Sequence, residues 1–93
     1  KLIKKHPSLE LPEWKLNNLG LQLIFNPKTS QKGILVLQFA IYLYPKSANL
    51  FDSLAEAYVY MNDKKNAIIN FKKSLVLNPE NQNAINRLKE LNK

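Results

Sequence analysis

The sequence predicts an all-α protein built as an α-solenoid, in which antiparallel helix pairs stack side by side. The main observation is a self-similarity with a period of about 34 residues, because repeats of that length form stacked helical hairpins. A second observation is that small and bulky side chains recur in phase. The recurring sets are Gly33, Leu37, Ala40 and Pro45 with Ala67, Phe71, Ser74 and Pro79, and Leu16, Leu19, Gly20 and Leu23 with Phe51, Leu54, Ala55 and Tyr58.

The first helix is expected to follow a short connector. Residues 1–11 are interpreted as that connector, because they combine a basic start with a His-Pro-Ser turn signal, and the helical domain is expected over 12–93. Pro12 suits the first turn of a helix, where its missing N–H is not needed. Asn26 and Pro27 should stop this helix after residue 25.

The second helix completes the first repeat, over about 12–46. Thr29 and Ser30 are the candidates for its N-cap, since hydroxyl side chains accept the free N–H groups of a first turn. The helix should end at Tyr44, because a residue that precedes proline is driven out of the helical region.

The second repeat is expected over about 47–80, again as two helices. Ser47 can cap the third helix, and Asp63 can cap the fourth, which should reach about residue 77 before Asn78 and Pro79. Ile85 then occupies, in a third repeat, the position that Leu16 and Phe51 occupy in the first two. A fifth helix, over about 81–93, is polar on one side and is interpreted as a solubilising cap.

The repeat pattern resembles the tetratricopeptide family. Its W-x2-L-G-x2-Y … A-x3-F … P pattern is matched in the second repeat and, more loosely, in the first, which has one extra residue in its inner loop. The matching residues of the second repeat are Phe51, Leu54, Ala55, Tyr58, Ala67, Phe71 and Pro79. The resemblance covers roughly residues 12–93 and implies a right-handed α-solenoid of about two and a half repeats.

The residue types argue against catalysis by this chain. Its one histidine, His6, lies in the predicted connector, and no serine lies in a G-x-S-x-G or S-x-x-K pattern. There are no cysteines, so neither disulfides nor thiolate metal sites can form. Asp52 and Glu56 lie one helical turn apart, but no further ligand joins them. We therefore expect no enzyme activity, no cofactor and no metal.

The charge of the chain is interpreted as a solvated outer face. The net charge is +7, which suggests nucleic acid or an anionic membrane as a partner. However, all but one of the 14 basic residues are lysines, the exception being Arg87, and they are scattered. Arginine is the residue that recognises phosphate and guanine bidentately, so a nucleic-acid site is not expected. The longest apolar run, 33–43, is too short to span a membrane.

The resemblance implies a groove lined by the first helix of each repeat, which contacts extended peptides in this family. By motif phase, the candidate groove residues are Asn17, Asn18, Leu21, Asn49, Asp52, Ser53, Glu56, Tyr60, Asn83, Asn86, Arg87 and Glu90. Asparagine offers both donors and an acceptor, which suits a peptide backbone. The carboxylate clamp of one subfamily is matched only at Arg87 and is not expected. A polar groove wall without a ligand remains an alternative.

A second candidate surface lies on the second helix, which is apolar on nearly all sides. Two and a half repeats cannot bury all of it, and an exposed apolar patch usually marks an interaction site. The candidate docking residues are Ile34, Leu35, Val36, Phe39, Tyr42 and Leu43. The connector 1–11, a preceding domain or a second copy of the chain could cover them, and we expect a preceding domain or a partner chain. The isolated chain is then predicted to self-associate into a homo-oligomer through residues 34–44.

Two functions follow from these observations. The first is a non-catalytic protein- or peptide-interaction module. The second is an accessory or oligomerisation domain at the C-terminus of a bacterial serine hydrolase, since the stretch 49–79 is similar to tails that follow esterase and β-lactamase-like enzymes. The catalytic domain would then lie upstream of Lys1, and a chain that begins with lysine instead of methionine is expected to come from a longer protein.

Overall fold

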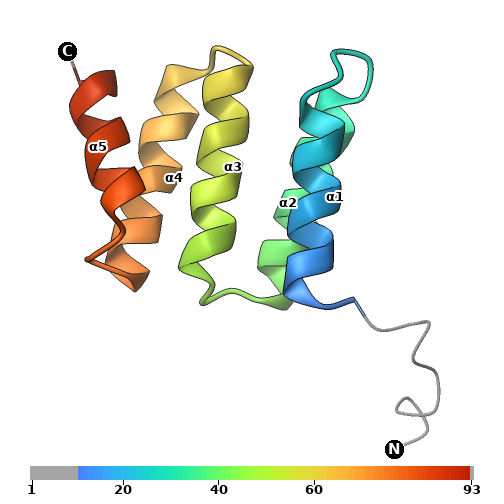
Figure 1. Cartoon of the computed structure of the whole chain (residues 1–93), viewed down its shortest axis with the longest axis horizontal. Helices are drawn as coiled ribbons and strands as arrows, with labels where there is room; N and C mark the ends of the chain where they lie inside the picture. The colour runs from blue at the N-terminus through green and yellow to red at the C-terminus, as the bar shows by residue number, and fades with distance from the viewer. Residues whose placement is uncertain (1–10, 93) are drawn as a thin grey trace, which may run out of the picture.

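The computed structural model describes residues 11–92, and this part of the chain folds into five α-helices with no strand (Figure 1). The helices are α1 (Glu13–Ile24), α2 (Ser30–Leu43), α3 (Ala48–Tyr60), α4 (Lys64–Leu77) and α5 (Gln82–Leu91). Consecutive helices run in opposite directions, and α1, α3 and α5 lie in front of α2 and α4 in this view (Figure 1). The predicted all-helical class is confirmed. The bounds of α1, α2 and α4 fall within one residue of the expected positions, whereas α5 ends at Leu91, two residues before its expected end.

Side chains at the starts of the later helices explain where these helices begin. The Ser47 hydroxyl accepts a hydrogen bond from the Leu50 N–H at 3.1 Å, and the Asp63 carboxylate accepts one from the Asn66 N–H at 3.2 Å. Both predicted caps are therefore confirmed. Asn81 caps α5 in the same way, because its Oδ1 accepts from the Ala84 N–H at 3.3 Å. Each cap satisfies a donor that the first helical turn leaves unpaired.

The starts of α1 and α2 differ from the prediction. Pro12 lies at the N-cap position, and α1 begins one residue later, so the expected helical Pro12 is wrong by one position. The Thr29 and Ser30 hydroxyls do not cap α2. They donate to the carbonyl oxygens of Leu23 and Ile24 at 2.7 and 2.8 Å, and so they satisfy acceptors at the end of α1. The two hydroxyls thereby close the first hairpin.

Two hydrophobic clusters hold the helices together. The larger one joins the first helix pair to α3 and consists of Leu16, Ile24, Ile34, Leu37, Ala40, Leu50, Leu54 and Ala57. The smaller one joins α3, α4 and α5 through Ala55, Ala67, Phe71 and Ala84. Phe71 is fully buried, and Tyr58 is half-buried against both clusters. Several bulky residues of the repeat pattern, namely Leu16, Leu37, Leu54, Tyr58 and Phe71, therefore connect the helices, whereas Leu19 is exposed.

The predicted connector, 1–11, lies outside the described residues except for Leu11, which is exposed. His6 lies outside them as well. Within 11–92, no helix is both long and apolar enough to cross a lipid bilayer.

Candidate functional site

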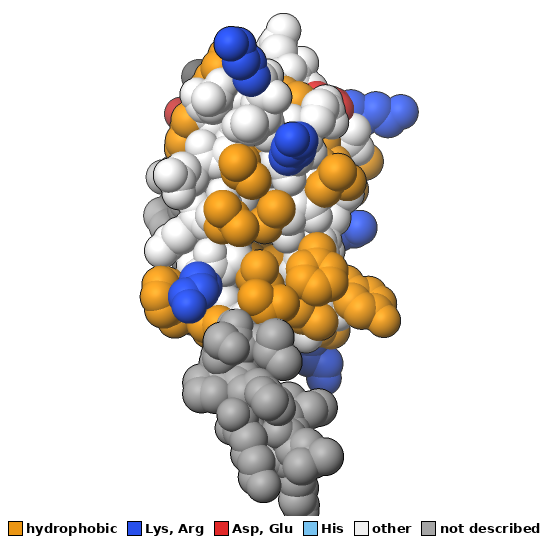
Figure 2. Space-filling view, turned by 90° about the vertical axis from the view of Figure 1, so that its right-hand side faces the viewer, with side chains coloured by type: hydrophobic (Ala, Val, Ile, Leu, Met, Phe, Trp, Pro, Cys, Tyr) orange, Lys and Arg blue, Asp and Glu red, His pale blue; other side chains and the backbone are white. Residues whose placement is uncertain are grey.

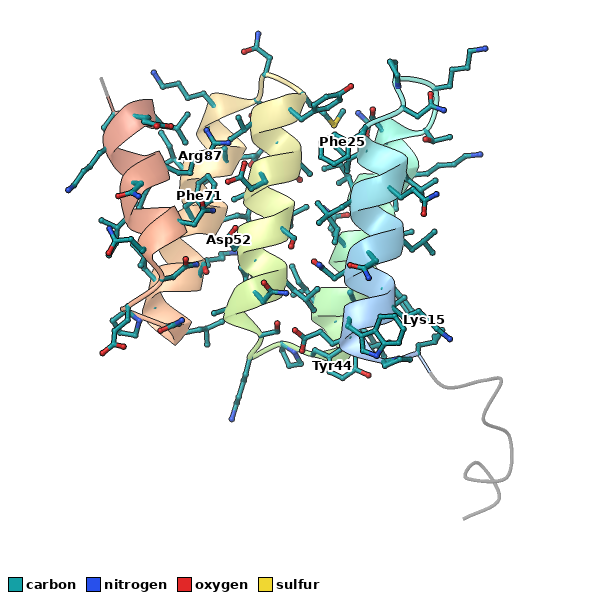
Figure 3. The ribbon with its side chains drawn as sticks, viewed as in Figure 1. Lys15, Phe25, Tyr44, Asp52, Phe71 and Arg87 are labelled. Atoms are coloured by element: carbon teal, nitrogen blue, oxygen red, sulfur yellow. The ribbon has the colours of Figure 1, made fainter. Side chains whose placement is uncertain are left out.

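The candidate groove residues come from α1, α3 and α5, which form the surface that we call the groove face. Its α3–α5 half holds a polar network, and Figure 3 shows Asp52 and Arg87 between these two helices. The Asp52 carboxylate accepts hydrogen bonds from Asn81 Nδ2 at 2.7 Å and from Asn83 Nδ2 at 2.9 Å. Asn81 Nδ2 also donates to the Ser74 hydroxyl at 2.9 Å, which ties α4 into the same network.

One turn further along α3, Glu56 binds Arg87 of α5 in a two-point ion pair. Arg87 Nε donates to Glu56 Oε2 at 2.9 Å, and Nη2 donates to Oε1 at 2.8 Å. Arg87 Nη1 also contacts Glu90 Oε1 at 3.2 Å. The hydrogen bonds to Glu56 raise the pKa of Arg87 above its usual range, while partial burial acts in the opposite direction. Arg87 is therefore held in place as a charged, oriented group at the edge of the groove face.

The α1–α3 half of the groove face contains an apolar hollow of about 280 Å³. Its lining residues are Leu21, Ile24, Phe25, Glu56, Ala57, Val59, Tyr60 and Arg87. Phe25 and Tyr60 form one end of the hollow, with their rings in an edge-to-face arrangement 5.3 Å apart, and the Tyr60 hydroxyl donates to the Phe25 carbonyl oxygen at 3.3 Å. The hollow thus has apolar walls and an ion pair at one edge.

The structure brings together seven of the twelve predicted groove residues. Asp52, Glu56, Asn83, Arg87 and Glu90 join in the polar network, while Leu21 and Tyr60 line the hollow with Glu56 and Arg87. The asparagines at 18, 49 and 86 are exposed, and Asn86 Oδ1 accepts from Gln82 Nε2 at 3.0 Å. Asn17 is half-buried, and its Oδ1 has no hydrogen-bond partner within the described part of the chain.

Ser53 does not belong to the exposed groove face, and its prediction is wrong. Only 7% of Ser53 is exposed, because it lies on the same side of α3 as Leu50, Leu54 and Ala57, which pack against the first helix pair. The repeat phase predicted an exposed position for Ser53, but the side chain lies one position inside the core.

Several residues of the site were missed by the sequence analysis. Phe25 is the main one, although it lies 35 positions before Tyr60 and thus shares its phase in the repeat. Ile24, Ala57 and Val59 were missed because apolar residues beside a core carry no signal that separates a groove wall from the interior. Asn81 was missed because it lies in the loop before α5.

The predicted docking surface on α2 is largely accessible. Leu35, Phe39, Tyr42 and Leu43 are exposed, and Val36 is half-buried. Ile34 is the exception and its prediction is wrong, since it is 6% exposed and packs in the cluster between α2 and α3.

These surfaces present apolar side chains, amide groups and one two-point ion pair. Among residues 11–92, no group of three or more histidine, cysteine, aspartate or glutamate side chains could hold a metal ion. No model of a protein family matches the chain, and no curated protein is found to be similar to it. The interpretation of the site therefore depends on its residues and their geometry.

Proposed function

We propose that the chain is a non-catalytic protein-interaction module of the tetratricopeptide type, a right-handed α-solenoid whose groove face binds an extended peptide. The observation that supports this most strongly is the apolar hollow on the groove face, bordered by Phe25, Tyr60 and the Glu56–Arg87 pair. An accessible hollow with apolar walls and a few oriented polar groups is the usual form of a binding site.

The size of the hollow points to a side chain instead of a small molecule as its occupant. Its volume of about 280 Å³ lies below the range of about 300–1,000 Å³ typical of pockets for drug-sized ligands. A large apolar side chain of a peptide, such as leucine or phenylalanine, would fit inside it. Burying such a side chain contributes about 1.5–3 kcal/mol.

The polar residues divide into those that build the groove face and those that are free to contact a peptide. Asp52, Glu56 and Arg87 bind partners on α5 or α3, so these residues fix the position of α5. The exposed amides of Asn18 and Asn49 lie on α1 and α3. They can donate to and accept from the backbone of an extended peptide without selecting its sequence.

Selection from a random peptide library, followed by affinity measurements on the selected peptides, tests this function. We expect the selected peptides to share one large apolar residue, and replacing that residue by alanine should weaken binding about tenfold or more. Tyr60→Ala in the protein should weaken binding to a similar extent, because it removes one wall of the hollow. Val76→Ala is the matched control, since Val76 is an exposed apolar residue of α4 that does not line the hollow.

Two results would contradict the proposed function. One is a library selection that yields no peptide with a shared apolar residue. The other is a set of selected peptides whose affinity is the same for wild type and Tyr60→Ala, when circular dichroism shows that both proteins are folded.

A further inference from the structure

Helix α1 exposes residues whose counterparts on α3 are buried. Leu19 is 45% exposed, whereas Leu54, which follows it by 35 positions, is 4% exposed. On α2, Leu35 and Phe39 are exposed like their counterparts Ile69 and Lys73, so the difference in burial between the two pairs lies on α1. Lys15 and Leu19 are one turn apart on α1, and Lys32, Leu35, Val36 and Phe39 share one face of α2; we call these six residues the end face of the helix stack. The packing surface that α3 buries is therefore repeated on α1, where no other part of residues 11–92 covers it.

The structure shows what covers the same positions in the second pair. There, Leu50 and Leu54 pack against Ile34 and Leu37 of α2 in one cluster. Gln38 and Ile41 of α2 border a hollow with Leu54, Tyr58 and residues of α4, and Gln38 Nε2 contacts the Tyr58 hydroxyl at 3.5 Å. The covering element is thus a helix whose contact residues are Ile34, Leu37, Gln38 and Ile41, at the spacing of one helical face.

The end face differs from its counterpart in charge. Lys15 takes the place of the buried Leu50, and Lys32 takes the place of Asn66, which lines the hollow beside α2. The only acidic residue of α1 and α2 is Glu13, and its carboxylate accepts a hydrogen bond from the Ser47 hydroxyl at 2.7 Å. Figure 2 shows hydrophobic side chains gathered over this side of the molecule, with lysines between and around them.

We propose that the end face binds an amphipathic helix of a partner protein that presents a leucine- or isoleucine-rich stripe flanked by acidic residues. The stripe would pack on Leu19, Val36 and Phe39 as α2 packs on the second pair, and the acidic flanks would face Lys15 and Lys32. Opposite charges at the rim of such an interface favour the correct partner and speed its association. This interface uses none of the residues of the groove face.

The charges also decide between this partner and a second copy of the chain. Two end faces brought together by a two-fold axis would bring Lys15 and Lys32 of both copies into one interface that holds no acidic residue of the end face, and like charges at an interface are unfavourable. A helix with acidic flanks removes this repulsion. For this reason we favour an acidic helix over the self-association that the apolar sequence of α2 suggested.

A synthetic helix of about 16 residues provides the probe, since shorter peptides are poorly helical in water. It has leucines at the stripe positions, glutamates at both flanks and alanine elsewhere, and a control peptide has lysines in place of the glutamates. Binding to the full chain 1–93 is measured by fluorescence anisotropy. We expect the glutamate peptide to bind and the lysine peptide to bind at least about tenfold more weakly.

The protein variants use substitutions at exposed positions. Phe39→Lys introduces the residue found at the counterpart position, Lys73, and should weaken binding about tenfold or more by removing an aromatic contact. Val76→Lys adds the same charge at an exposed apolar site of α4 and should leave the affinity unchanged within about twofold. In the double variant Lys15→Glu, Lys32→Glu, the preference between the two peptides should reverse.

Three outcomes would overturn this proposal. The first is that the glutamate peptide does not bind. The second is that it binds equally well to Phe39→Lys and to wild type while both proteins remain helical by circular dichroism. The third is a dimer of the chain alone, detected by sedimentation equilibrium and dissociated by Phe39→Lys, which would mean that a second copy occupies the end face.

Discussion

The backbones of α1 and α2 meet at Gly20 and Gly33, where a Cβ on Gly33 would lie 2.7 Å from the carbonyl oxygen of Gly20. A Cβ on Gly20 would lie 2.6 Å from Cγ of Leu37, which is fully buried. Neither glycine has a positive φ, so both are required by close approach and not by backbone conformation. At the counterpart positions, Ala55 and Ala67 are fully buried. Helices α1 and α2 can therefore approach this closely only because residues 20 and 33 have no side chain beyond a hydrogen atom.

Gly33→Ala should destabilise the protein, although alanine is the better helix former by about 1 kcal/mol. The new methyl group would meet a backbone oxygen that cannot move without shifting α1, and such overpacking typically costs about 1–3 kcal/mol. We expect a net loss of about 1 kcal/mol in the free energy of unfolding, measured by urea denaturation. Gly20→Ala should cost less, because the atoms it meets belong to a side chain. A Gly33→Ala variant more stable than wild type would contradict this packing.

Ser74→Ala should also destabilise the protein, although the counterpart position in the first repeat is the alanine Ala40. Ser74 is fully buried, and its hydroxyl donates to the Ala48 carbonyl oxygen at 2.8 Å and accepts from Asn81 Nδ2. Its removal leaves Asn81 with one partner fewer beside Asp52, at a cost of about 1–2 kcal/mol. Thermal unfolding measures the effect. An unchanged melting temperature would mean that this network does not fix α5.

The sequence predicted much of the fold because its signals are local. Ser47 and Asp63 could be identified as caps from their positions, and Phe71 could be placed in the core from the repeat phase. The groove face was less predictable, since the choice between buried and exposed depends on how neighbouring helices are rotated. Ser53 follows the half-buried Asp52, and Ile34 precedes the exposed Leu35, so a small rotation of α3 or α2 decides on which side of the boundary they fall.

The polar network could not be predicted from the sequence for a related reason. Asp52 and Asn83 were both placed on the groove wall, but nothing in their spacing showed that they bind each other instead of a ligand. Their hydrogen bonds depend on the distance between α3 and α5, which tertiary packing sets. Phe25 is the residue that the repeat phase alone could have added, because it corresponds to Tyr60.

The Glu56–Arg87 pair should contribute modestly to stability. Its side chains are 27% and 36% exposed, which places it between a buried and a surface ion pair. A double-mutant cycle with Glu56→Gln and Arg87→Gln should give a coupling free energy of about 0.5–1 kcal/mol that decreases in 1 M salt. The pair Arg87–Glu90 is the reference, since it has a single contact and a more exposed carboxylate, and its coupling should be smaller. Equal coupling for both pairs would count against the two-point geometry.

The N-cap of α4 should make stability depend on pH in the acid range. Hydrogen bonds from the Asn66 side chain and then from its backbone N–H lower the pKa of Asp63 below its ordinary value of 3.8. A carboxyl group whose pKa is lower in the folded state stabilises the protein above the unfolded pKa, and this contribution is lost as the pH falls through the folded pKa.

We therefore expect the difference in melting temperature between wild type and Asp63→Asn to shrink below about pH 4. Asparagine can still accept the Asn66 N–H but does not titrate. Asp63→Ala, which removes the cap at every pH, is the control. A difference that stays constant from pH 7 to pH 2 would show that the ionised form of Asp63 has no special role.

The most direct test of the proposed groove is a methyl NMR titration of the chain with the tightest peptide from the library selection. We predict that the resonances of Leu21, Ile24 and Val59 shift most, with those of Leu19 and Leu35 unchanged. Shifts centred on Leu19 and Leu35, or no shifts at a saturating peptide concentration, would contradict a peptide-binding groove formed by α1 and α3.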